Sequence, residues 1–265
     1  MYNKKRALIC FVCLSLLLIM ILIYRYQVFT NNNVIFSPPT LHHWFGTDII
    51  GNDIFLRSID ALFIALITLA IVLPAIYMGG LIIGCILSYF DNAKIREFFL
   101  NLVYYWVTLP VLLIAIFLLI LVGAGQSNVI AILIFVLLPT QSLYVYSQME
   151  EAKKEDFVIV KRSYGFSKGY ILLYHLFPYI RNSYNIYTFS RMPEILMMDL
   201  AFNFLGLGVQ PPHSSFGKML FEGLSFMFSA WWMWVFPAIL VILLFVGVNW
   251  VVRNMAEKKW RIKRV

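Results

Sequence analysis

Long stretches of apolar residues constrain this chain more than any other feature. Six of them, at residues 7–24, 62–90, 98–122, 129–146, 179–204 and 231–252, are separated by shorter polar segments. An apolar stretch of about 20 residues can cross a bilayer core of about 30 Å as a helix. Because backbone groups inside lipid must satisfy one another, spanning segments of this kind are helical. The pattern predicts an all-α polytopic membrane protein with six transmembrane helices.

The composition supports this class. The chain is 62% hydrophobic and 13% charged, with a mean hydropathy of +0.82, whereas a soluble domain carries about 25% charged residues. The first apolar stretch follows Lys4, Lys5 and Arg6 and could serve as a signal peptide, but no small-residue cleavage site follows it. We therefore expect a retained N-terminal transmembrane helix (1–26), a loop (27–61), a five-helix core (62–252) and a basic tail (253–265).

The distribution of basic residues predicts the orientation. Three of them, Arg25, Arg57 and Lys218, fall on one predicted side. The opposite side carries Lys4, Lys5, Arg6, Lys94, Arg96, Lys153, Lys154, Lys161, Arg162, Lys168, Arg253, Lys258, Lys259, Arg261, Lys263 and Arg264. Since basic loops stay in the cytoplasm, both termini and the loop 149–178 are expected there. This asymmetry accounts for the net charge of +8, so membrane lipid is an expected partner and no nucleic acid is predicted.

The polar stretch 150–178 is the longest interruption in the second half of the chain. Its acidic residues come first and its basic residues follow, which suits the dipole of a helix. Gly165 stands where a helix would end in a left-handed residue, and Ser167 where a second helix would be capped. The stretch therefore predicts two short helices joined at residues 164–167.

The loop 27–61 contains two glycines, Gly46 and Gly51, with Asp48 and Asp53 beside them. This spacing predicts an ordered turn that leads into an interfacial helix. A metal site could be built from Asp48 and Asp53 together with His42 and His43. Carboxylates near turns and helix starts are more often caps, and we favour that interpretation.

The segment 179–204 carries charged residues at a depth in the membrane where placing a charge costs free energy. Arg191 and Glu194 are three residues apart, so they can pair on one helix face, and Asp199 follows further along. Such groups usually face a bundle interior or a water-filled cavity. Two interpretations remain: these residues line a translocation path, or they form a structural ion pair.

Small residues and prolines mark further features of the apolar segments. Gly80 and Gly84 form a small-xxx-small pattern that permits close helix packing. Pro74, Pro110 and Pro139 lie in or beside three segments and favour kinks. Beyond residue 204, a group of glycines and prolines, namely Gly206, Gly208, Pro211 and Pro212, should end the fifth segment sharply. Residues 216–228 should form a short amphipathic helix along the outer face.

Several kinds of catalytic chemistry have no counterpart in the sequence. It contains no G-x-x-x-x-G-K-[ST] phosphate loop and no H-E-x-x-H. The four histidines lie beside no obvious nucleophile. We therefore expect a chain that is not an enzyme and that needs no cofactor or resident metal.

Three blocks in order resemble the permease subunits of binding-protein-dependent ABC importers, in particular the second-permease type of the dipeptide, oligopeptide and nickel group. Residues 43–53 (HWFGTDIIGND) are similar to that group's H-x-x-G-T-D-x-x-G-R-D block. Residues 204–212 (FLGLGVQPP) resemble its F-L-G-L-G-V-x-x-P block. The stretch 150–178 resembles the cytoplasmic EAA loop, whose glycine and proline spacing is kept by Gly165 and Pro178.

The resemblance implies a type I importer permease fold in the inner or plasma membrane of a bacterium. It also implies a homologous second permease, two ABC ATPase subunits and an extracytoplasmic solute-binding protein as partners. The residues implied to contact the ATPase are Tyr164, Gly165, Phe166, Ser167, Lys168 and Pro178. The motifs implied to lie on the binding-protein side contain Gly46, Asp48, Gly51, Asp53, Gly206, Gly208, Pro211 and Pro212.

The chain departs from the family pattern at several positions. Residues 159–161 (IVK) replace the E-A-A triplet, Asn52 replaces a usual arginine, and Asp199 stands where a glutamate is usual. Arg191 and Glu194 fall where the family is usually apolar. Small peptides, nickel and a metal chelate remain possible substrates. A membrane scaffold or sensor without transport is the alternative from another class, because the namesake glutamate is missing.

Overall fold

The computed structural model describes residues 34–89 and 93–262, so the predicted helix at 7–24 lies outside the described residues. The described part is helical, and it contains no strand. Its longer helices are α2 (Ile54–Tyr89), α3 (Ala93–Thr108), α4 (Val111–Val122), α5 (Gln126–Ala152), α8 (Phe177–Phe189), α9 (Met192–Phe204) and α11 (Trp232–Ile262). The shorter ones are α6 (Asp156–Ser163), α7 (Lys168–Ile171), the π-helix η1 (Leu172–Leu176) and α10 (Phe216–Leu224).

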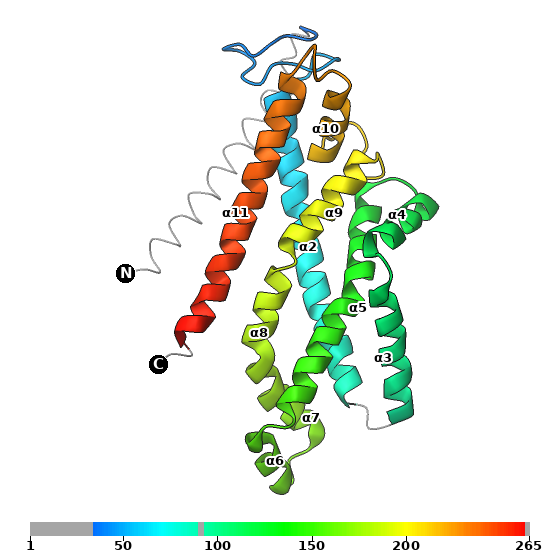
Figure 1. The fold of residues 1–265 in the computed structure, drawn as a ribbon, viewed down its shortest axis with the longest axis vertical. Helices are drawn as coiled ribbons and strands as arrows, with labels where there is room; N and C mark the ends of the chain where they lie inside the picture. Colours follow the sequence, from blue (N-terminus) through cyan, green and yellow to red (C-terminus); the bar gives the residue numbers. More distant parts are fainter. Residues whose placement is uncertain (1–33, 90–92, 263–265) are drawn as a thin grey trace.

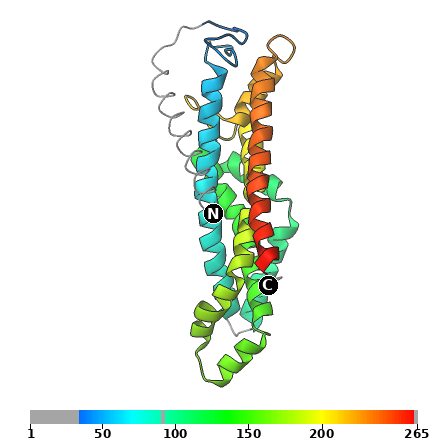
Figure 2. The ribbon, with the colours of Figure 1, turned by 90° about the vertical axis from the view of Figure 1, so that its left-hand side faces the viewer.

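The helices form an elongated bundle with two different ends (Figure 1). One end, here the corner end, is made by α6 and α7. The other, the loop end, carries the segment 34–53 and α10. A view turned by 90° shows the same elongated shape, with α6 and α7 again at the extremity (Figure 2). The expected amphipathic helix at 216–228 is present as α10, although it ends at Leu224.

The α2 helix begins at Ile54 rather than at residue 62, where the apolar segment starts. Its first turn is capped by Asp53, whose Oδ1 accepts hydrogen bonds from the backbone N–H groups of Phe55 (2.7 Å) and Leu56 (3.4 Å). A side-chain oxygen at this position satisfies donors that have no partner within the helix. The helix therefore extends into part of the predicted loop 27–61.

The predicted segment at 98–122 is not one continuous helix, and the kink that Pro110 was expected to favour is a complete break. The structure breaks it at Leu109 and Pro110 into α3 and α4, which meet at an angle of 90°. Proline has no backbone N–H and clashes with the preceding turn, so a helix cannot continue through it undisturbed. Pro74 and Pro139, in contrast, lie inside α2 and α5 without ending them.

The predicted helix at 179–204 is also divided. It consists of α8 and α9, which are separated at Ser190 and Arg191, and Pro193 stands in the first turn of α9. At its other end α8 follows α7 and η1 without interruption, so that the chain is helical from Lys168 to Phe189. The second of the two predicted short helices is therefore the start of a longer rod.

Fewer spans are identified than the six predicted. Among the described residues, three helices are long and apolar enough to cross a membrane, at Ile54–Tyr89, Gln126–Ala152 and Trp232–Met255. The bent pair of α3 and α4 makes a fourth if the two helices count as one span. The prediction of a polytopic helical membrane protein is confirmed, whereas the number six is not.

Close packing of α2 against α5 organises the bundle. A Cβ atom on Gly80 would lie 2.6 Å from Cβ of Gln141, and one on Gly84 would lie 2.6 Å from Cβ of Val145. The two glycines thus allow the helix backbones to approach, as their spacing predicted. Around this contact the main apolar core includes the fully buried side chains of Val72, Ile76, Leu133, Leu137, Ile195 and Phe202.

Candidate functional site

Two residues, Gly165 and Ser167, determine the local backbone conformation at the corner end. Gly165 follows the C-terminal end of α6 with φ +78°, a left-handed conformation that glycine adopts without steric cost. Ser167 caps α7, since its Oγ accepts a hydrogen bond from the backbone N–H of Tyr170 at 3.4 Å. The predicted helix–turn–helix at 164–167 is confirmed. Its turn reverses the chain at the far extremity of the molecule (Figure 2).

Aromatic side chains stand exposed at this turn. Tyr164 is 77% exposed and Phe166 is 41% exposed, and the ring of Phe166 stacks on that of Tyr170 with centroids 5.2 Å apart. Lys168 begins α7, whereas Pro178 lies in the first turn of α8. Of the predicted contact residues, 164–168 therefore share the corner, and Pro178 belongs to the rod behind it.

At the loop end, Asp48 is the centre of a tight turn. Its carboxylate accepts hydrogen bonds from the backbone N–H groups of Ile50 and Asn52, both at 2.8 Å, and from Nδ2 of Asn52 at 3.0 Å. Gly46 and Gly51 flank the turn with φ +76° and +89°. The glycines and Asp48 are thus brought together as predicted, and Asn52, which departs from the family pattern, is part of the same turn.

Asp53 serves as the cap of α2 rather than as part of a metal site. Its Oδ2 lies 2.8 Å from Nδ1 of His43, while Asp48 is directed to the turn and to Arg57. Within 34–89 and 93–262, no group of three or more His, Cys, Asp or Glu residues could hold a metal ion. The alternative site at His42, His43, Asp48 and Asp53 is therefore not assembled.

Arg57 joins three segments at the loop end. Its Nη1 donates to Asp48 at 2.7 Å, its Nη2 donates to Glu222 in α10 at 2.7 Å, and its Nε donates to Oγ of Ser214 at 3.0 Å. Beside it, Asp60 of α2 accepts a hydrogen bond from the backbone N–H of Ser214 at 2.7 Å. These contacts fix the 34–53 segment and α10 to the start of α2.

The turn 205–213 is closed by the side chain of Asn203. Its Oδ1 accepts a hydrogen bond from the backbone N–H of Val209 at 2.7 Å, and its amide fills the space in which a Cβ of Gly208 would lie. Gly206 adopts φ +75°. The predicted sharp end of the fifth segment is confirmed, and Pro211 and Pro212 are exposed within the turn.

A groove of about 740 Å³ lies between α2, the start of α5 and the 205–213 turn. Its wall on α2 is apolar, with Ile59, Phe63 and Ile67, and Gln126 of α5 belongs to the lining as well. The amide of Gln126 donates to Asp199 Oδ1 at 2.8 Å and to Thr68 Oγ1 at 2.7 Å. Asp199, 5% exposed, is therefore held behind the groove, and it is Gln126 that lines it.

Arg191 and Glu194 lie apart from this groove, at the break between α8 and α9. They form an ion pair of 2.6 Å at i,i+3, as their spacing predicted, and Arg191 also donates to the hydroxyl of Tyr187. The side chain of Glu194 is 38% exposed. The structure therefore does not gather the three path candidates Arg191, Glu194 and Asp199 into one site.

Sequence reasoning missed the residues that connect distant segments. Gln126 precedes the predicted apolar segment at 129–146, and Asn203 lies near the end of the segment at 179–204; neither residue has a predicted role. The pairing of Arg57 with Glu222 joins positions separated by 165 residues. No periodicity or local spacing signals such a contact, although Arg57 was one of the few basic residues assigned to its side.

Comparison with known proteins gives a consistent result. Residues 80–261 match the family described as "Binding-protein-dependent transport system inner membrane component". The "Dipeptide transport system permease protein DppC" of Bacillus subtilis (strain 168) is 28% identical over 224 residues, covering 84% of this chain and 69% of the relative. The "Glutathione transport system permease protein GsiD" of Escherichia coli O6:K15:H31 (strain 536 / UPEC) is 30% identical over 216 residues, covering 80% and 70%.

A solved structure shares the fold. A chain of the MetNI methionine ABC transporter, in a structure of its inward-facing conformations, superposes with a TM-score of 0.55 at 17% identity. The match covers 76% of this chain and 96% of that chain. The family match includes the corner end, since it begins in α2 and continues into α11.

Proposed function

The chain belongs to the family of binding-protein-dependent transport system inner membrane components, and from this premise we propose that it forms half of the translocation path of an ATP-driven importer for small peptides. The chain itself is a multi-pass transport subunit of the inner membrane. In the proposed assembly it pairs with a second, homologous permease, and ATP hydrolysis belongs to two ATPase subunits.

The observation that carries the proposal is the exposed aromatic turn at the corner end. Large apolar side chains such as Tyr164 and Phe166, exposed at the tip of a structured corner, are suited to insertion into a groove of a partner. The helical rod that starts at Lys168 connects this corner directly to α8. Movement of an ATPase bound there would be transmitted to the bundle as a rigid-body displacement.

We propose that the corner end faces the cytoplasm and the loop end faces the solute-binding protein. The basic residues of α6 and α7 support this orientation, since positive charge is retained on the cytoplasmic side. At the loop end, Arg57 locks the 34–53 segment and α10 into one platform. A rigid platform suits a docking surface, because little conformational freedom is lost on binding.

The groove along α2 is the proposed contribution to the path. Its lining is mainly apolar, and its polar groups belong to Asp60, Gln126, Ser127, Gln210 and His213. Its open side would be closed by the second permease. Gln126 supplies a hydrogen-bonding group within this lining, and the buried Asp199 holds that amide in place. Arg191 and Glu194 remain path candidates at the level of the α8–α9 break.

Peptides are favoured as substrates because the relatives are named as dipeptide, peptide and glutathione permeases. Nickel carried by a small organic chelator is the second substrate class. A chelate of that size presents carboxylates and amides much as a small peptide does. The two classes can be separated by uptake of a radiolabelled dipeptide and of radioactive nickel in cells that contain the complete importer.

The proposed coupling is tested with Gly165→Pro, which removes the left-handed turn, because proline fixes φ near −65°. We expect this variant to lose copurification with the ATPase subunits and to lose peptide uptake. Gly169→Ala is the matched control, since a Cβ there would meet no other atom within 4 Å. If Gly165→Pro retained both the ATPase and uptake, the assignment of the corner would be wrong. Normal ATPase binding by the unmodified chain without any uptake would favour a scaffold or sensor.

A further inference from the structure

The groove along α2 contains a buried carboxylate near its loop end. Asp60 lines the groove with a side chain that is only 7% exposed. Its Oδ2 accepts a hydrogen bond from the backbone N–H of Ser214 at 2.7 Å. Its Oδ1 lies 3.4 Å from Nδ1 of His213, which lines the same groove. Because burial removes most of its hydration, a carboxylate in this position needs hydrogen bonds and a counter-charge.

The counter-charge of Asp60 is exchangeable. The guanidinium of Arg57, one helical turn earlier, is directed to the side chains of Asp48, Ser214 and Glu222. Within the described part of the chain, the ion-pair partner of Asp60 is the imidazole of His213, which is charged only when it is protonated. The side chain of His213 is 63% exposed, so it can turn away without disturbing a packed core.

The remaining lining of the groove suits a small peptide. The α2 helix supplies an apolar wall made of Ile59, Phe63, Ile64 and Ile67. The start of α5 and the 205–213 turn supply side chains that can bond to peptide groups, namely Gln126, Ser127 and Gln210. The volume of about 740 Å³ lies within the range of about 300–1,000 Å³ that is usual for small-molecule sites.

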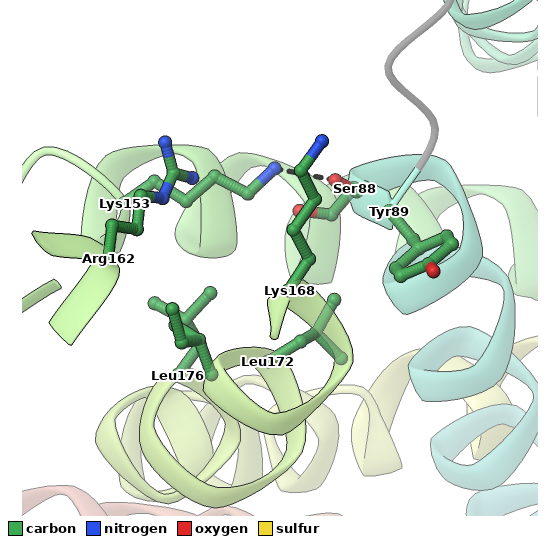
Figure 3. A pocket seen from close by; sticks show the side chains of 8 residues that line it. Ser88, Tyr89, Lys153, Arg162, Lys168, Leu172 and Leu176 are labelled. Carbon is green, nitrogen blue, oxygen red and sulfur yellow. Dashed lines mark hydrogen bonds between the residues drawn. The ribbon is translucent and has the colours of Figure 1, made fainter. Parts of the chain in front are cut away.

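The hollow behind the corner differs from this groove in size and in charge. It measures about 90 Å³, and its charged lining residues are Lys153, Arg162 and Lys168 (Figure 3). None of its lining residues in the described part of the chain is acidic. Nζ of Lys153 already lies 2.5 Å from both the carbonyl oxygen of Ser88 and Oε1 of Glu150. A cationic group of a peptide therefore finds a buried carboxylate in the groove and none in this hollow.

We propose that Asp60 receives the α-ammonium group of the entering peptide in place of His213, so that the groove selects peptides with a free N-terminus. This inference rests on the proposed import of small peptides. An ammonium group donates charge-assisted hydrogen bonds to a carboxylate, and these are about twice as strong as hydrogen bonds between neutral groups. The backbone N–H of Ser214 would continue to hold Oδ2, while the side chains of the peptide lie against the apolar wall of α2.

The test is photochemical labelling of the groove in the purified importer complex. A p-benzoylphenylalanine residue replaces Phe63, and in a matched control it replaces Phe135, which is exposed on α5 outside the groove lining. Radiolabelled alanylphenylalanine or its N-acetyl form is added without the solute-binding protein, whose own preference therefore does not enter. We expect the free dipeptide to label position 63 at least about tenfold more than the acetylated form. Position 135 should be labelled weakly and equally by both.

Substitutions at the two partners identify the group that is recognised. Asp60→Asn keeps an acceptor for the N–H of Ser214 but removes the charge, so labelling by the free dipeptide should fall to the level of the acetylated form. His213→Arg leaves Asp60 intact and places a permanent cation beside it, which should also abolish the preference. His213→Gln removes the ion-pair partner and should increase the preference. Thermal unfolding shows which variants are folded, and the two His213 variants test the proposal even if Asp60→Asn is not.

Three outcomes would overturn the proposal. Equal loss of labelling by both dipeptides in a folded Asp60→Asn variant would give Asp60 a structural role only. An unchanged preference in His213→Arg would mean that this carboxylate does not receive the ammonium group. No labelling at position 63, in an importer that takes up the dipeptide, would place the peptide outside the groove and leave the proposed import intact. Absence of dipeptide uptake by the complete importer would instead refute the proposed function itself.

Discussion

Nη1 of Arg57 lies 2.7 Å from Oδ2 of Asp48, and the side chain of Asp48 is only 1% exposed. The carboxylate of Asp48 is buried, and its negative charge is compensated by the guanidinium of Arg57 and by the backbone N–H donors of its own turn. Such a pair specifies a unique arrangement more than it adds stability, but breaking it leaves a buried charge. The folded arrangement of the loop end should therefore depend strongly on the side chain of Arg57.

Arg57→Ala should therefore destabilise the protein by about 3–5 kcal/mol, because the buried carboxylate of Asp48 loses its counter-charge. The measurement is the thermal unfolding midpoint of the purified chain in detergent. Lys218→Ala removes a basic residue at the same end and should stay within about 0.5 kcal/mol. A midpoint for Arg57→Ala equal to that of Lys218→Ala would show that the clamp is not needed for stability.

Gly84→Ala should destabilise the bundle by roughly 1–3 kcal/mol, because the added methyl group would overlap Val145 and separate α2 from α5. Gly247→Ala, in α11, is the control, since a Cβ at that position meets no atom within 4 Å. Thermal unfolding in the same detergent compares the two. Equal stability of the two variants would contradict the close packing of α2 and α5.

Gln126→Leu should destabilise the protein by about 1–3 kcal/mol, since Asp199 and Thr68 both lose a donor in a buried position. Replacing the carboxylate as well, in Gln126→Leu/Asp199→Leu, should recover part of this loss, because no unsatisfied charged group remains. The observable is again the unfolding midpoint. A double variant less stable than Gln126→Leu alone would argue against the pairing of these two side chains.

Exchanging the two charges of the α8–α9 break, as Arg191→Glu/Glu194→Arg, keeps an i,i+3 ion pair and should preserve folding. If the pair lies on the translocation path, uptake of a labelled dipeptide should change at least several-fold. The single variant Glu194→Arg places two positive charges side by side and shows the effect of losing the ion pair, with which the exchange variant is compared. Unchanged uptake in a folded exchange variant would leave a purely structural pair.

Local signals in the sequence predicted local structure well. The glycine at 165 and the serine at 167 each have a specific conformational or capping preference, and both were found in the expected role. The small-xxx-small pattern at Gly80 and Gly84 correctly predicted a close helix contact. In these cases the physical cause lies within a few residues of the signal.

The hydropathy pattern did not predict the helix bounds where a proline or a capping residue determines them. An apolar run does not show whether it is one helix or two, and Pro110 and Pro193 divide segments that read as continuous. In the same way, Asp53 starts α2 within a segment too polar to be counted as part of a span. Contacts such as Arg57 with Glu222 depend on the tertiary arrangement and have no local signature.

The uninterrupted helix from Lys168 to Phe189 acts as a lever. At about 1.5 Å per residue it is roughly 33 Å long, comparable to the thickness of a bilayer core. A tilt of about 10° around one end would displace the other end by roughly 6 Å, which is about one helical turn. Because the chain breaks at Ser190 and Arg191, a fulcrum exists at the far end of this rod. A displacement of the corner would therefore be largest at Lys168 and would decrease along the rod toward the break, so that the corner can swing while the bundle behind the break moves little.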